Sequence, residues 1–223
     1  MFAVLIEAEP RKEQRDSYFA KAAMLDSGLA RAPGFVESAR YRSLTRDGWI
    51  LSLSDWTDGA SLARWHERMR EEEEQWRQLV ADFRLRFGEV TSDTKAGPAG
   101  EVPAPPGDEA GGEGTYVTLI DARQAPEWIA ATNPYEMALY LGFDLYSYGD
   151  CISWDIFDSL TAPGAIVLAV TWGDARSAND HASTQIVPDD ARVRVVRIVR
   201  DDMMAELAGS AGAAAPGREP VRG

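Results

Sequence analysis

Residues suited to proton transfer beside a flat, aromatic ligand occur in both halves of the 223-residue chain. Trp65 and His66 are neighbours in a predicted helix, Glu7 lies in the first predicted strand, and Asp155 lies in a strand of the second half. A carboxylate or an imidazole can act as a general base, and an aromatic side chain can hold a flat molecule away from water. These four residues are therefore the candidate catalytic residues.

A second set of residues could line a pocket for such a ligand. Ser52 and Ser54 alternate with Leu51 and Leu53, which leaves one face of their strand small and polar. Alternation in the strand at residues 151–160 places an aromatic side chain and a carboxylate on each face, an arrangement that suits a phenolic ligand. The candidate substrate-binding residues are Ser52, Ser54, Tyr146, Trp154, Phe157 and His181.

Each candidate also has a purely structural interpretation. Trp65 could simply pack its helix onto the sheet, and His66, turned about 100° away from it, would then face solvent. Glu7 could lie at the exposed end of its strand, or it could point inward, where burial would raise its pKa toward that of a base. The two histidines have no Cys, Asp or second His at ligand spacing, so we predict no metal site.

The first half is predicted to fold in the order strand, helix, strand, strand, helix, strand. Apolar residues recur at helical spacing between residues 12 and 32, and Pro33-Gly34 ends that helix. Asp47-Gly48 marks a hairpin turn, and Asp58 can cap a helix that runs from Gly59 to Val80. The strands are predicted at residues 2–8, 36–44, 49–56 and 83–90.

Part of this sequence recurs in the second half. The stretch "WILSLSDWTDGASLARW" at residues 49–65 resembles "AIVLAVTWGDARSANDH" at residues 165–181, and an offset of 116 residues places Trp56 on Trp172. One such sheet leaves an apolar face without a partner, and a second sheet packed against it would cover that face. We therefore predict an α+β protein in which two ferredoxin-like βαββαβ modules form an internal pseudo-dimer.

Four segments follow from this pattern. The first module is predicted to span residues 1–94, and the Pro- and Gly-rich stretch 95–114 is predicted to be a flexible linker. A second, divergent module is predicted at 115–207 and a disordered tail at 208–223. The strands of the second module are predicted at residues 115–121, 151–160, 165–172 and 192–199, with helices at 134–141 and from 174 onward.

Composition excludes several classes of partner. A net charge of −13 argues against binding to nucleic acid or to an anionic membrane, because both require clustered basic residues. No run approaches the roughly 18 apolar residues of a membrane span. The single cysteine, Cys151, excludes an intrachain disulfide and fits a cytoplasmic location.

The chain resembles the antibiotic biosynthesis monooxygenase family. The resemblance rests on the "PGF" turn, on a strand ending in "SDWTD" before the "ASLARW" helix, and on "WDIFDSLTAPGAIVLAVTWGDA" in the second half. It implies the dimeric α/β barrel fold, in which a sheet and its helices enclose an apolar cavity. It also implies a monooxygenase of secondary metabolism that uses dioxygen on an aromatic phenol, quinol or anthrone of the polyketide type.

The sequence departs from the heme-degrading relatives of this family. Those relatives carry a histidine about ten residues after the helix tryptophan and an asparagine in the first strand, whereas this chain has Gln75 and Glu7 there. An imidazole is the usual protein ligand of heme iron, so we expect no heme. The resemblance to family members that oxygenate without metal, flavin or heme implies that no cofactor is used, although flavin is not excluded. The lost histidines favour a second hypothesis, a non-catalytic protein that binds a hydrophobic ligand or assembles with others. The resemblance leaves a third open, a cofactor-free cyclase or isomerase, because the same barrel supports polyketide cyclisation among distant relatives. Homodimerisation of the whole chain also stays open.

Overall fold

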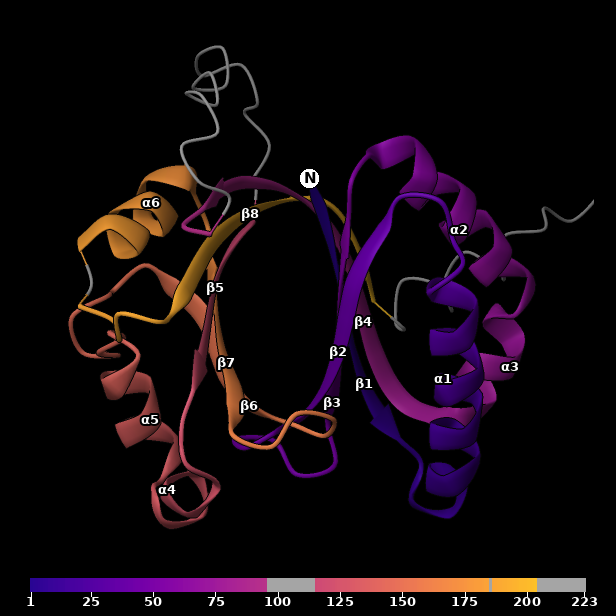
Figure 1. Cartoon of the computed structure of the whole chain (residues 1–223), viewed down its shortest axis with the longest axis horizontal. Coiled ribbons are helices and arrows are strands. Elements are labelled where there is room, and N and C mark those ends of the chain that lie inside the picture. The colour runs from indigo at the N-terminus through magenta and orange to yellow at the C-terminus, as the bar shows by residue number, and fades with distance from the viewer. Residues whose placement is uncertain (96–114, 185, 204–223) are drawn as a thin grey trace, which may run out of the picture.

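Eight antiparallel strands close into one barrel, and the helices lie outside it (Figure 1). The structure, a computed structural model, describes residues 1–95, 115–184 and 186–203. The order around the barrel is β1-β3-β2-β6-β7-β5-β8-β4. The strands are β1 (Phe2–Pro10), β2 (Phe35–Ser43), β3 (Ile50–Trp56), β4 (Val80–Asp93), β5 (Tyr116–Arg123), β6 (Cys151–Ser159), β7 (Ala165–Trp172) and β8 (Arg192–Met203).

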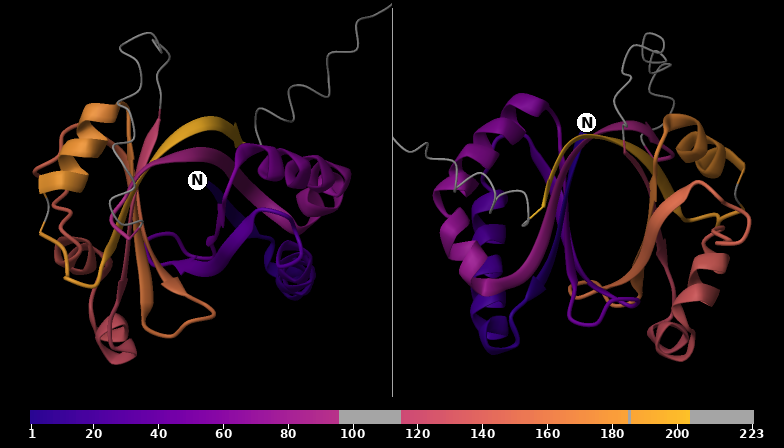
Figure 2. Two further views of the ribbon diagram at one scale, coloured as in Figure 1. Left: turned by 45° about the horizontal axis from the view of Figure 1, so that its top comes forward. Right: turned by 180° about the vertical axis from the view of Figure 1, so that it is seen from behind.

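Each half of the chain supplies one four-stranded sheet and the helices that cover its outer face. Figure 2 shows the helices of the first half on one side of the barrel and those of the second half on the other. The helices are α1 (Arg15–Leu29), α2 (Gly59–Glu71), α3 (Glu73–Leu79), α4 (Pro126–Ala131), α5 (Pro134–Tyr140) and α6 (Ala175–Thr184), with a short 3-10 turn, η1 (Lys12–Gln14), before α1. The predicted fold of two ferredoxin-like modules packed as an internal barrel is confirmed.

Three details differ from the sequence prediction. The single helix predicted from Gly59 to Val80 is interrupted at Glu72, whose backbone (φ −103°, ψ 1°) leaves the helical region and separates α2 from α3. The second module carries α4 ahead of the helix predicted at 134–141, and Asn133 separates the two helices as the N-cap of α5. The predicted linker, apart from Lys95, and the predicted tail at 208–223 lie outside the described residues.

The turns that lead into the outer helices use the same local chemistry in both halves. Asp58 accepts a hydrogen bond from the backbone N–H of Ser61 at 2.8 Å, and Asp174 accepts one from Ser177 at 2.9 Å. Gly34 adopts a positive φ of 77°, and a Cβ there would lie 2.5 Å from the Cβ of Ser61. Glycine is therefore required where the chain passes the N-terminus of α2.

The interior of the barrel is apolar in the middle and charged at both ends. Leu5, Leu53, Leu119 and Val167 belong to the central cluster. At one end Arg86 contacts Glu7 of its own module and Thr171 of the other module. At the other end Arg194 pairs with Asp121 of its own module, at 2.9 Å, and with Asp55 of the other module, at 2.8 Å. Arg86 and Arg194 occupy equivalent positions in the two modules. Arg86 of β4 is paired with Leu5 of β1, and Arg194 of β8 is paired with the equivalent Leu119 of β5.

The two modules meet along two strand seams that share a pseudo-twofold axis. At the β2–β6 seam, Arg42 is paired with Asp158. Asp158 occupies the position in the second module that is equivalent to Arg42 in the first, at the offset of 116 residues. At the β4–β8 seam, Glu89 stands opposite Arg197, again its own counterpart, at an offset of 108 residues. Both positions lie on the axis, and both hold a residue pair of opposite charge, with nitrogen–oxygen distances of 2.6 Å. Across the described residues, no helix combines the length and the hydropathy needed to cross a bilayer.

Candidate functional site

A cavity of about 650 Å³ lies between the sheet of the first module and its helices α1, α2 and α3. Alternation along β3 directs Ser52 and Ser54 toward this cavity, whereas Leu51 and Leu53 belong to the interior of the barrel. The wall is apolar over much of its area, and it also includes charged side chains, namely Asp26, Arg40, Arg70, Glu73, Glu74, Arg77, Arg200 and Asp202. Its residues include Ile6, Ala22, Leu25, Leu29, Met69, Val80, Phe83 and Leu85.

Trp65 and His66 both line this cavity. Trp65 is buried, with its ring centroid 5.5 Å from that of Trp56. His66 is half-buried, and its ring meets that of Phe87 edge-on at 4.8 Å. The expectation that His66 would face solvent is therefore wrong, because its ring packs against Phe87 and borders the same cavity as Trp65. Burial, followed by the charge of Arg200, lowers the pKa of His66, which keeps this imidazole neutral and able to accept a proton.

A polar chain that the sequence analysis missed crosses the sheet side of the cavity. Arg40 donates from Nε to the hydroxyl of Ser52 at 3.1 Å and binds Asp26 through two nitrogens, at 2.9 and 3.1 Å. Ser52 lies beside the hydroxyl of Tyr18, a buried residue of α1. Burial raises the pKa of Tyr18, so this phenol stays protonated and can donate a hydrogen bond. In the sequence, Tyr18 is indistinguishable from the other apolar positions of the helix predicted between residues 12 and 32.

Glu7 and Asp155 lie elsewhere, at one end of the barrel interior. Glu7 is buried between Arg86 and Arg46, and Asp155 accepts hydrogen bonds from Ser43 at 2.9 Å and from Arg46 at 2.8 Å. Burial acts to raise the pKa of Glu7, but the two arginine charges outweigh it and hold that pKa below its ordinary value. The expected exposed position and raised pKa are both wrong, because partners distant in sequence decide the charge state of this carboxylate.

Phe157 also faces the barrel interior, so it borders the cavity of about 350 Å³ near Glu7 rather than the cavity that contains Trp65. Trp154 is partly buried and packs on the opposite face of β6, 5.9 Å from the ring of Phe143. Tyr146 is 87% exposed. The sheet therefore divides the predicted binding residues of the second half between two faces, and it leaves Tyr146 at the surface.

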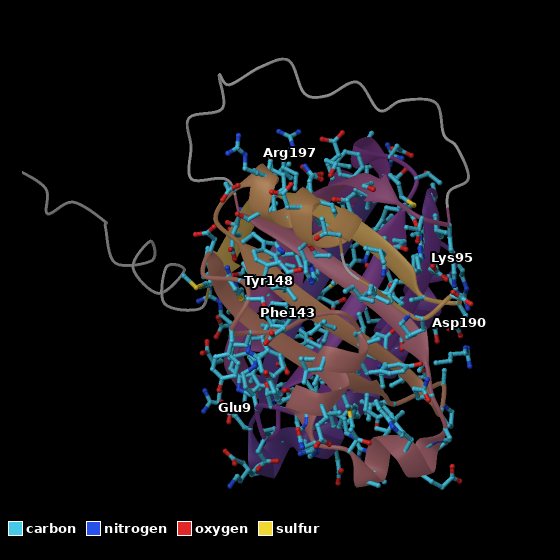
Figure 3. The ribbon with its side chains drawn as sticks, turned by 90° about the vertical axis from the view of Figure 1, so that its left-hand side faces the viewer. Glu9, Lys95, Phe143, Tyr148, Asp190 and Arg197 are labelled. Atoms are coloured by element: carbon cyan, nitrogen blue, oxygen red, sulfur yellow. The ribbon has the colours of Figure 1, made fainter. Side chains whose placement is uncertain are left out.

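The second module fills the space that is a cavity in the first module. Phe143 and Tyr148, labelled in Figure 3, stack on each other at 5.8 Å in front of Trp172. His181, the counterpart of Trp65 at the offset of 116 residues, is fully buried among these rings, at 5.0–5.6 Å from each of them. Burial lowers its pKa to about 4. Neither ring nitrogen of His181 makes a hydrogen bond of normal geometry to a described residue. The backbone of Gly142 lies close enough to raise the pKa of His181 slightly, but burial outweighs it. His181 is thus part of the core and not of an open site.

The candidate site is consequently asymmetric. Among the sequence-predicted residues, the structure brings Ser52, Ser54, Trp65 and His66 together around the cavity of the first module. It adds Tyr18, Arg40 and Asp26 to them. No group of three or more His, Cys, Asp or Glu side chains arranged to hold a metal ion occurs within residues 1–95, 115–184 and 186–203.

This architecture defines a protein of the dimeric α/β-barrel class in which both halves of the barrel come from one chain. The model of the antibiotic biosynthesis monooxygenase family matches residues 1–82. A jasmonate monooxygenase of Pyricularia oryzae is 33% identical over 199 residues, which cover 80% of this chain and 85% of that protein. The chain belongs to the antibiotic biosynthesis monooxygenase family, and its function is monooxygenase-like.

Two solved structures share the general arrangement at low similarity. An anthrone oxidase-like protein is 13% identical with a TM-score of 0.36, and the match covers 96% of each chain. A major regulator of staphylococcal pathogenesis is 7% identical with a TM-score of 0.30, over 90% of this chain and 100% of that one. At these values neither likeness bears on what the chain does.

Proposed function

We propose that the chain is a monooxygenase that uses dioxygen on a small, flat phenol, quinol or anthrone held in the first-module cavity, without a metal, heme or flavin. The observation that carries this proposal is a partly apolar cavity bordered by Trp65 and lined by both a neutral imidazole, His66, and a protonated phenol, Tyr18. A base and a hydrogen-bond donor in an apolar site are what the formation of a reactive substrate anion requires. The cytoplasm is the expected location.

The chemistry balances without an added reductant when the substrate supplies all the electrons. Conversion of an activated methylene follows CH2 + O2 → C=O + H2O, in which one oxygen atom enters the substrate and the other leaves as water. The substrate carbon is oxidised by four electrons, and both oxygen atoms are reduced. In this reaction His66 would accept the first proton, and the apolar wall would exclude bulk water from the oxygen-derived intermediate.

The relative from Pyricularia oryzae supports a second candidate substrate class. Its name assigns it jasmonate, which is a cyclic ketone with a carboxylate side chain. Simple hydroxylation of such a molecule needs two further electrons from a reductant, so flavin or another donor would have to take part. A requirement for added reductant therefore separates the two candidate reactions.

Filling the cavity should abolish oxygen uptake. Leu25 lines the cavity from α1, and its neighbour Met24 is 76% exposed on the same helix. We expect Leu25→Trp to reduce uptake with anthrones and naphthohydroquinones at least ten-fold, because the indole occupies the substrate volume, and Met24→Trp to leave it unchanged. The measurement uses an oxygen electrode, metal-free protein, and heat-denatured protein as the autoxidation control.

Three results would change the assignment. Uptake that is equal in the wild type and in Leu25→Trp would place the chemistry outside this cavity. Uptake only after addition of reduced flavin would favour hydroxylation over internal oxygenation. Tight binding of the same compounds without uptake, or their conversion without oxygen, would favour the binding protein or the cyclase, respectively.

A further inference from the structure

The second module contributes to the wall of the first-module cavity at both edges of the first sheet. Thr161, from the turn between β6 and β7, borders the cavity beside β2, and Arg200 and Asp202 of β8 border it beside β4. Strand β8 pairs with β4, where Arg200 lies opposite Phe87, and the end of β8 reaches the first-module side of the barrel (Figure 2). The end of β8 therefore forms part of a cavity that otherwise belongs to the first module.

Arg200 is connected to His66 through one aromatic ring. The guanidinium carbon of Arg200 lies 5.8 Å from the centroid of the Phe87 ring, and the ring of His66 meets the same ring edge-on at 4.8 Å. A cation over the face of an aromatic ring is attracted by the electron density of that ring. Arg200 therefore helps to fix the ring of Phe87, a buried residue, against which the imidazole packs.

Asp202 holds Arg200 in this position. The Nε atom of Arg200 lies 2.7 Å from a carboxylate oxygen of Asp202, and the two residues alternate along β8, so they share one face of the strand. The side chain of Arg200 is 49% exposed and that of Asp202 is 18% exposed. An ion pair with this much exposure contributes little to folding stability. Its effect on the site can therefore be separated from its effect on the fold.

Four charged side chains act on the His66 imidazole from three elements. Arg200 and Asp202 come from β8, Arg70 comes from α2, and Glu73 comes from α3, whereas β4 presents an uncharged ring. Burial lowers the pKa of His66 most, the charge of Arg200 comes next, and the two carboxylates oppose them. The charge of Arg200 thus favours the neutral imidazole, which is the form that can accept a proton.

The second module lacks this arrangement at its equivalent positions. The offsets of 116 residues for the helix and 108 residues for the last strand relate His66, Phe87 and Arg200 to Ala182, Val195 and Ser92. Ser92 is paired with Val195 just as Arg200 is paired with Phe87, so the backbone geometry is the same in both places. Of the two modules, only the one with an open cavity carries the three side chains. This difference associates them with the cavity and not with closure of the barrel.

We propose that Arg200, held by Asp202, is a positioning residue of the first-module site: through the ring of Phe87 it holds the His66 imidazole at the cavity wall, with a positive charge beside it. This inference rests on the proposed function, in which His66 accepts the proton of the substrate. It makes the site a product of both modules, because the base lies in one module and the residue that orients it lies in the other.

The test follows the two histidines of the chain, His66 and His181, by NMR titration of the full-length protein. The variants are Arg200→Met, which removes the charge, and Asp202→Asn, which keeps the charge of Arg200 but loosens its hold. Arg197→Met is the matched control, because Arg197 lies on the same strand, is 37% exposed and is not among the charged groups that act on His66. Circular dichroism verifies that each variant is folded.

We expect Arg200→Met to raise the pKa of His66 by about half a pH unit, because a cation that opposes protonation has been removed. Asp202→Asn should not raise this pKa. Both variants should reduce the displacement that the Phe87 ring current gives to the His66 resonances, whereas His181 should not respond. Where oxygen uptake is observed, the acid limb of its pH profile should move with the pKa of His66.

Unchanged His66 resonances and an unchanged His66 pKa in both variants would overturn the inference. An equal response in Arg197→Met would also overturn it, because the effect would then follow from net charge alone. The NMR measurement needs no turnover. A wild type that consumes no oxygen, but in which His66 responds to Arg200→Met as expected, would refute the proposed oxygenation and leave the positioning of His66 by Arg200 standing.

Discussion

Replacing Arg194 with methionine is expected to lower the free energy of unfolding by about 3–5 kcal/mol. The guanidinium is 2% exposed and binds the carboxylates of Asp55 and Asp121. Methionine fills part of the same volume but leaves both carboxylates in the barrel without that counter-charge. Urea denaturation at pH 7 measures the change, and the midpoint and the slope are reported separately.

Arg197 provides the matched control for this experiment. It lies on the same strand, its side chain is 37% exposed, and it pairs with Glu89. Solvent screens such a pair, so Arg197→Met should change stability by less than about 1 kcal/mol. The loss in Arg194→Met should also shrink as the pH falls, because Asp55, whose pKa is raised by burial, can then become neutral. Equal losses in the two variants would show that burial of the ion pair is not the cause.

Acidification is expected to destabilise the protein through His181, by about 3 kcal/mol between pH 6.5 and pH 4. The folded protein holds the pKa of His181 at about 4 because the ring is buried, whereas the unfolded chain has the ordinary value of 6.5. The unfolded chain therefore binds the proton first as the pH falls. The contribution to stability is complete above pH 6.5 and is lost as the pH drops to 4.

His181→Phe tests this expectation, because phenylalanine retains an aromatic ring and cannot be protonated. Between pH 7.5 and pH 4, the free energy of unfolding of the wild type should fall by about 3 kcal/mol more than that of the variant. Protonation of carboxylates affects both proteins equally, so it cancels in this difference. His66 is the other histidine of the chain and is only half-buried, so His66→Phe should recover less. Parallel pH profiles for the wild type and His181→Phe would contradict the account of a buried, neutral ring.

The fold could be predicted from the sequence because its signals are local. Alternation along residues 49–56, the Asp58 cap and the recurrence of the Trp56 stretch at Trp172 each describe one strand or one turn. They fix the two sheets, and the apolar faces of these sheets leave few ways to pack. The same alternation placed Ser52 and Ser54 on one face, and that face lines the cavity.

The site could be predicted only in part because much of it depends on distant partners. Glu7 forms an ion pair with Arg86, and Arg40 forms one with Asp26. No local sequence pattern connects the members of either pair. Tyr18 looks like any apolar position of an amphipathic helix until the cavity beside it is known. In the second module, the rings of Phe143 and Tyr148 come from a segment without regular periodicity, so nothing in the sequence indicates that they fill the cavity.

The charged pairs on the pseudo-twofold axis show what fusion into one chain permits. In a dimer of identical subunits, a residue on the axis faces its own copy, so Arg42 would meet arginine and Glu89 would meet glutamate. Here each meets a residue of opposite charge. The constraint of self-complementarity has been lifted, and each half recognises the other better than it would recognise itself. This freedom also lets the halves differ: the first encloses a cavity between its sheet and its helices, whereas the second packs aromatic side chains in the equivalent space.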